Sequence, residues 1–131
     1  MPGCHDLVES RDGLAPMRRL LFIITTDPRT SPRPAEALRI AAGIGAWKKA
    51  EVIIYLRGAA VLSLGECVDH LVDDDNFTRY LPLVAEWGHP VYVEKATPHL
   101  RALGASSFDY QEVGDEALAD LAAGCACVTR F

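Results

Sequence analysis

The sequence predicts an α/β protein, a three-layer α/β/α sandwich with a mostly parallel five-stranded sheet. Strand-like segments alternate with helical ones along the chain, a pattern typical of consecutive βα units. Residues 20–26 and 51–56 are apolar almost throughout, as expected for strands buried on both faces. The 131 residues are enough for one domain with a single core.

The elements follow one another in a regular order, divided by glycine, proline and acidic residues. Strands are predicted at residues 20–26, 51–56, 90–93, 108–113 and 125–131. Helices are predicted at residues 34–47, 66–72, 77–87 and 98–103, and between Gly114 and Gly124. Residues 59–65 are predicted to form a loop and residues 73–75 an acidic turn. Alternating polar residues in 108–113 indicate a strand near an edge of the sheet.

Local signals place three of the helix ends. Thr97 followed by Pro98 is an N-cap with proline at the first helical position. Asn76 is expected to cap the helix at 77–87. The triplet at 43–45, Gly-Ile-Gly, is not a dinucleotide-binding fingerprint because it lies at the end of a helix, so it predicts close helix packing instead.

Composition narrows the class of function. Residues 1–17 lack helical or strand periodicity, so we expect an N-terminal arm at 1–17 and the α/β domain at 18–131. A net charge of -5 disfavours a nucleic-acid partner. No apolar run approaches the roughly 18 residues of a membrane span, and the first residues do not resemble a secretory signal. We therefore expect a cytoplasmic protein with no membrane partner.

Polar residues at the predicted carboxyl edge of the sheet indicate a ligand site. Asp27 and Arg57 follow the first two strands, and Glu94 and Lys95 end the third. His99 lies in the first turn of the helix that follows. Because open α/β sheets bind ligands at the carboxyl ends of their strands, these five residues are predicted to bind a ligand.

The four cysteines are too few and too irregular for a disulfide framework, so reduced thiols are expected. Cys67 and His70 would share a helix face, which makes Cys67 a candidate catalytic nucleophile, although a half-buried cysteine and a surface histidine are the favoured interpretation of this pattern. Cys125 and Cys127 would point to one face of a strand, either filling a tight core layer or acting as paired thiols. No metal site or cofactor is predicted.

Several segments resemble the DsrE/DsrF/DsrH family of sulfur-relay proteins, which includes TusB, TusC and TusD. The carrying segments are Leu-Leu-Phe-Ile-Ile-Thr-Thr-Asp, Ala-Leu-Arg-Ile-Ala-Ala, Glu-Val-Ile-Ile-Tyr-Leu-Arg-Gly-Ala-Ala-Val, Gly-His-Pro-Val-Tyr-Val and Leu-Arg-Ala-Leu-Gly-Ala. The resemblance implies a five-stranded DsrE-like sheet, trimers or hexamers, and a persulfide-carrying cysteine that passes sulfur to a carrier protein. At the place matching that cysteine this chain has Glu94, which cannot form a persulfide.

Three functions follow from these observations. The first is sulfur handling without the usual persulfide cysteine, either through another thiol such as Cys67 or as a subunit without a catalytic cysteine. The second is a non-catalytic oligomeric module that binds a small ligand at the carboxyl edge of the sheet. The third is a metal or acid/base enzyme in which Glu94 acts with His99 or His70. Fold alone does not choose among them.

Overall fold

The computed structural model describes residues 18–131 apart from 48–49, 66–67, 88–89, 105 and 107. Its strands form one sheet in the order β4-β3-β2-β1-β5, and all neighbouring strands run parallel. The strands are β1 (Arg18–Ile24), β2 (Ala50–Leu56), β3 (Val91–Glu94), β4 (Tyr110–Val113) and β5 (Cys127–Arg130). The predicted α/β architecture is confirmed, whereas the arm predicted at 1–17 lies outside the described residues.

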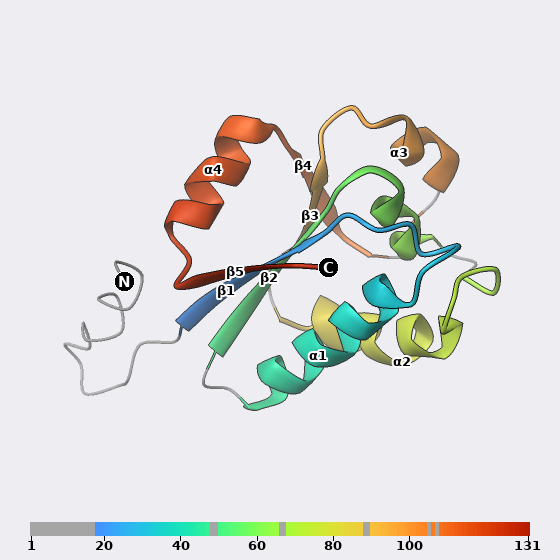
Figure 1. Cartoon of the computed structure of the whole chain (residues 1–131), viewed down its shortest axis with the longest axis horizontal. Coiled ribbons are helices and arrows are strands. Elements are labelled where there is room, and N and C mark those ends of the chain that lie inside the picture. Colours follow the sequence, from blue (N-terminus) through green and yellow to red (C-terminus); the bar gives the residue numbers. More distant parts are fainter. Residues whose placement is uncertain (1–17, 48–49, 66–67, 88–89, 105, 107) are drawn as a thin grey trace.

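Helices cover the two faces of the sheet unequally. The helices are α1 (Arg33–Trp47), α2 (Asp74–Ala85), α3 (Pro98–Leu103) and α4 (Asp115–Ala123), with a 3-10 helix, η2 (Gly58–Leu64). Figure 1 shows α1 and α2 together on one side of the sheet and α4 on the other. Among the described helices, none combines the length and apolar character needed to cross a membrane.

Alternation along β1 and β2 divides the core into two layers, because successive strand side chains point to opposite faces. The layer beneath α1 and α2 contains the buried strand residues Phe22, Ile24, Val52, Ile54 and Leu56. The layer beneath α4 contains Leu21, Ile23, Ile53 and Tyr55, with Cys125 beside them. Both faces of the two central strands are therefore buried, as their apolar runs predict.

Helix α1 packs closely through small residues, as predicted. Leu38, Ala41 and Ala42 are buried on one face of the helix. At Gly45 an added Cβ would lie 2.6 Å from the indole ring of Trp87, too close for any other residue without displacement. Gly43 has open space at the same position. The close approach in the glycine triplet is thus made at Gly45 alone.

The segment between β2 and α2 differs from its prediction. Residues expected to form a loop at 59–65 instead form the 3-10 helix η2, with Ala60, Val61 and Leu64 fully buried. The helix predicted at 66–72 is absent from residues 68–72, which form turns and bends. Burial of η2 explains the difference, because small apolar residues are tolerated in a tight 3-10 turn packed on the core.

Helix α2 begins earlier than predicted. Asp74 and Asp75 belong to its first turn rather than to a separate acidic turn. Carboxylates are favoured there by the positive end of the helix dipole. Asn76 is consequently inside the helix, and the N-cap position falls at Asp73 with a left-handed φ of 55°.

At the two edges of the sheet, the prediction for one strand is confirmed and the prediction for the other is corrected. Strand β4 lies at an edge, as its alternating pattern indicates. At the other edge, β5 is shorter than the predicted 125–131 strand. Cys125 precedes it and is buried, whereas Cys127 begins it and is exposed. The interpretation that both thiols fill a tight core layer is therefore wrong for Cys127.

Candidate functional site at the carboxyl edge of the sheet

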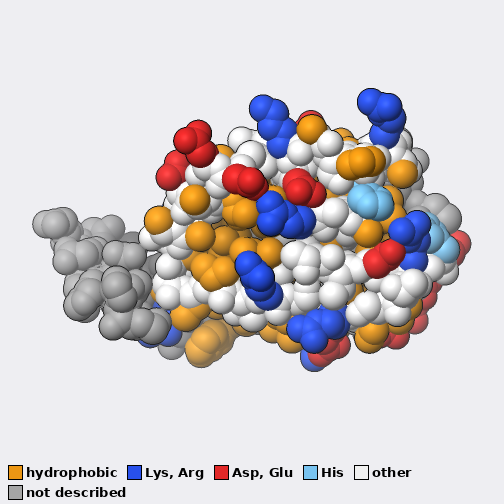
Figure 2. All heavy atoms as spheres, turned by 45° about the horizontal axis from the view of Figure 1, so that its top comes forward, with side chains coloured by type: hydrophobic (Ala, Val, Ile, Leu, Met, Phe, Trp, Pro, Cys, Tyr) orange, Lys and Arg blue, Asp and Glu red, His pale blue; other side chains and the backbone are white. Residues whose placement is uncertain are grey.

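Three charged side chains meet where the parallel strands end on the face covered by α4. Arg57 follows β2, Glu94 is the last residue of β3, and Asp115 is the first residue of α4. Glu94 and Arg57 were predicted to bind a ligand, and the structure brings them together. Figure 2 shows a basic side chain flanked by acidic ones near the middle of this face.

Glu94 is held by the chain segment that follows β2. The Gly58 N–H donates a hydrogen bond of 3.0 Å to Glu94 Oε1. The other carboxylate oxygen, Oε2, lies 3.4 Å from Arg57 Nε in an ion pair. Gly58 has a φ of 59°, a left-handed conformation that glycine adopts without strain. This turn positions the N–H that fixes the carboxylate.

The Arg57 guanidinium lies between two carboxylates. Its terminal NH2 group donates to Asp115 Oδ1 at 2.9 Å, while Nε faces Glu94 without hydrogen-bond geometry. The Asp115 side chain is 88% exposed, compared with 40% for Arg57 and 32% for Glu94. Asp115 is therefore the outer, more solvated partner, and Glu94 the inner one.

Tyr55 lies below this cluster and is fully buried. The guanidinium carbon of Arg57 is 5.9 Å from the centre of the Tyr55 ring, a cation–π contact. Burial raises the pKa of the Tyr55 phenol, and the nearby Arg57 charge only partly opposes this. Among the described residues, its hydroxyl has no partner in hydrogen-bond geometry.

Lys95 does not join the cluster, although it was predicted to bind the same ligand. It is exposed, and its side chain forms no ion pair within the described part of the chain. Ala96, with a left-handed φ of 61°, donates from its backbone N–H to Glu112 Oε1 at 3.1 Å. The backbone therefore turns immediately after β3, and adjacent residues 94 and 95 diverge.

Asp27 forms a second group with Arg29. Its two carboxylate oxygens accept hydrogen bonds from the Arg29 guanidinium at 2.8 to 3.2 Å, and Oδ1 also accepts from the Arg29 backbone N–H. Arg29 lowers the pKa of the Asp27 carboxyl through these bonds, with a smaller contribution from His99. The Asp27 carboxylate is therefore hydrogen-bonded to Arg29, and it makes no hydrogen bond with His99 among the described residues.

Helix α3 begins as predicted, yet it is not what holds Glu94. Thr97 is the N-cap and accepts a hydrogen bond from the His99 backbone N–H at 3.5 Å, with Pro98 at the first position. The contacts of Glu94 are with Gly58 and Arg57 instead.

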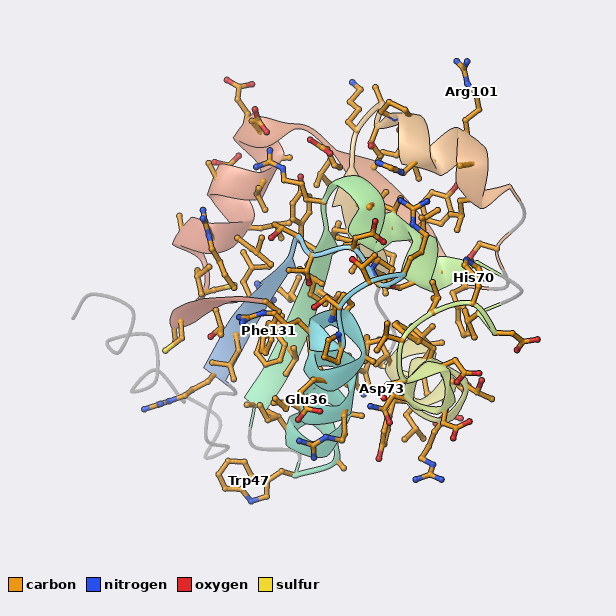
Figure 3. All side chains as sticks on the ribbon, turned by 45° about the vertical axis from the view of Figure 1, so that its right-hand side comes forward. Glu36, Trp47, His70, Asp73, Arg101 and Phe131 are labelled. Carbon is orange, nitrogen blue, oxygen red and sulfur yellow. The ribbon has the colours of Figure 1, made fainter. Side chains whose placement is uncertain are left out.

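The thiol and metal hypotheses gain no support from the described residues. Cys67 lies outside the described residues, and so does its proposed pairing with His70. His70 is exposed on the turn that leads into α2 (Figure 3). No group of three metal-binding side chains occurs within the described ranges. In the described part of the chain, Glu94 forms no hydrogen bond or ion pair with either histidine of the acid/base hypothesis.

Sequence reasoning missed Gly58, Tyr55, Asp115 and Arg29. Gly58 and Asp115 carried a usable signal, because Gly58 lies two residues after a predicted strand and Asp115 lies at a predicted helix start. Tyr55 was hidden in an apolar strand, where an aromatic residue normally only fills the core.

Comparison with known proteins identifies the fold. No family model matches the sequence, and no curated protein matches it. Among solved structures, the crystal structure of the ychN protein from E. coli superposes with a TM-score of 0.70 at 16% identity, covering 88% of this chain and 100% of that one. That neighbour has a DsrE-like fold. With its five parallel strands and flanking helices, this chain therefore has the DsrE-like α/β fold.

Proposed function

We propose that this protein takes part in sulfur handling as a subunit that carries no sulfur at the end of β3 and instead presents a binding site there. One observation carries the proposal: at the place where the resemblance implies a persulfide cysteine, Glu94 is fixed by the Gly58 N–H and faces Arg57. A residue held in this way positions Arg57 and shapes the site without reacting. The DsrE-like fold supports the sulfur context.

The same surroundings would suit a thiolate or persulfide anion. Arg57 supplies a positive charge, and the Gly58 N–H supplies a directed donor. Both favour an anionic group over a neutral one. On this proposal, replacing Glu94 by cysteine restores a sulfur-accepting position at the end of β3.

The test is site-resolved mass spectrometry after brief exposure to polysulfide. We expect Glu94→Cys to gain one sulfur at position 94 faster than Glu36→Cys, a matched control at which the nearest guanidinium is that of Arg39. We also expect the native exposed thiol of Cys127 to react no faster than the control. Equal rates at positions 94 and 36 would contradict the sulfur role.

A second function is a ligand-binding module with no part in sulfur chemistry. The buried, unpartnered hydroxyl of Tyr55 favours it, because buried polar groups are nearly always satisfied by something. In that case Glu94→Cys would gain sulfur only at the control rate, while the cluster around Arg57 would still bind a small molecule.

We further propose that the protein assembles into a homo-oligomer, a trimer or hexamer, and acts with a sulfur-carrier protein. The resemblance suggests both. Strand β5 supports assembly, because it is an edge strand with every residue exposed, and such edges offer unpaired backbone groups to another chain. Light scattering should give three or six times 14.3 kDa, and a single copy at micromolar concentration would contradict this proposal. A cytoplasmic location remains a prediction.

A further inference from the structure

Resting on the binding site of the proposed function, we propose the chemistry of its ligand. Arg57, the Tyr55 hydroxyl and the first turn of α4 bind the carboxylate group of a small molecule. In the free protein, the side chain of Asp115 occupies the place of that carboxylate.

Two buried donors in the cluster have no acceptor among the described residues. These are the Tyr55 hydroxyl and Arg57 Nε. Tyr55 is fully buried, so an unsatisfied hydroxyl there is unusual. The two groups are close enough to interact with each other, although not in hydrogen-bond geometry. Arginine can only donate, so the hydroxyl proton of Tyr55 still lacks an acceptor. The group that completes the site therefore carries oxygen acceptors.

The start of α4 adds further donors at the same point. Its N-cap residue is Gly114, which has no side chain to satisfy the first N–H groups. The helix has nine residues, and its positive end favours an anion. The Arg57 guanidinium lies 5.9 Å from the centre of the Tyr55 ring, and Arg57, Glu94 and Asp115 are close enough to influence the pKa of the Tyr55 hydroxyl.

The charges of the site favour a ligand with a single negative charge. Arg57 and Glu94 together are neutral, and Glu94 stays in place because Gly58 holds it. Once Asp115 leaves, the site offers the neutral pair and the helix terminus, which suit a monoanion better than a doubly charged phosphate. Asp115 itself shows that a carboxylate fits against the guanidinium at 2.9 Å, a geometry that arginine favours.

Asp115 is suited to displacement. Its side chain is 88% exposed, and within the described residues its one hydrogen-bonded ion pair is with Arg57. An exposed ion pair of this kind contributes little, so an incoming carboxylate can replace it. Movement of Asp115 and of the partly exposed Arg57 side chain then opens Nε and the Tyr55 hydroxyl to the ligand.

The experiment is an acetate titration of the full chain, followed by NMR at the arginine Nε–H signals in 0.15 M salt. We expect Asp115→Ala to bind acetate about two- to fivefold more tightly than wild type, the change expected on removing an exposed competing ion pair. Glu116→Ala is the matched control. It removes the same charge from the same turn of α4, and we expect a smaller change. Adding Tyr55→Phe to Asp115→Ala should weaken binding again.

Equal effects of Asp115→Ala and Glu116→Ala would overturn the proposal, because the effect would then be general charge repulsion. Unchanged affinity after Tyr55→Phe would also overturn it. Tighter binding of phosphate than of acetate would overturn the choice of a carboxylate. Rapid persulfide formation at Glu94→Cys without acetate binding would reject this inference alone. Acetate binding with persulfide formation at the control rate would reject the sulfur role alone.

Discussion

Removing the Glu94 carboxylate tests how the site is held together. Glu94→Ala leaves the Gly58 N–H without its acceptor, and an unsatisfied, partly buried donor costs about 1–3 kcal/mol. Loss of the ion pair with Arg57 adds at most about 1 kcal/mol, discounted because the side chains of Arg57 and Glu94 are 40% and 32% exposed to solvent. We therefore expect Glu94→Ala to lower the free energy of unfolding by about 1–4 kcal/mol in total.

Glu94→Gln separates the two contributions. Its amide oxygen can still accept from the Gly58 N–H, so only the charge is lost and we expect a decrease of about 0.5–1 kcal/mol. The assay is urea unfolding at equilibrium with an unchanged m-value. Glu36→Ala, which breaks the surface pair of Glu36 with Arg39, is the control. If Glu94→Ala is no more destabilising than Glu36→Ala, Glu94 does not brace the site.

Three further predictions concern packing, acid stability and thiol reactivity. Gly45→Ala should lower the free energy of unfolding by about 1–3 kcal/mol, because the added Cβ would meet a tryptophan ring. Gly43→Ala in the same helix has open space and should raise the free energy of unfolding by about 0.4–1 kcal/mol. Urea unfolding that ranks the two variants the other way would refute the packing argument. The lowered pKa of Asp27 means that its pairing stabilises the fold above the unfolded value of about 3.9 and is lost as pH falls through the folded value. Asp27→Asn should therefore lose less stability than wild type on acidification below about pH 4, and parallel pH profiles would contradict this. Native alkylation should modify Cys127 and spare Cys125, whose thiol pKa is raised by burial; mass spectrometry showing equal labelling would be inconsistent with that burial.

Much of the fold follows from the sequence because the central strands are unambiguous. Residues 20–26 and 51–56 have few arrangements open to them other than strands buried on both faces, and they form β1 and β2. The segment at 59–72 was misjudged because its structure depends on tertiary burial. Small residues in η2 pack on the core, and no local signal distinguishes that from a loop.

The site was only partly predictable for a related reason. Arg57 and Glu94 could be placed together, because the carboxyl ends of adjacent parallel strands meet at one edge. The contacts that hold them in place could not be predicted, because these contacts depend on the face of the sheet to which each side chain points. Glu94 points toward the face of α4 and contacts Gly58, so the nearby start of α3 has no part in holding it.

The central claim is that the end of β3 is an anion site created by Gly58 and Arg57. It is tested most directly by the alkylation rate against pH of Glu94→Cys, in a background whose native cysteines are replaced by serine. We predict a titration midpoint below the roughly 8.5 of an unperturbed cysteine, which rises when Arg57→Gln is added. A midpoint at or above that value, unchanged by Arg57→Gln, would contradict the account.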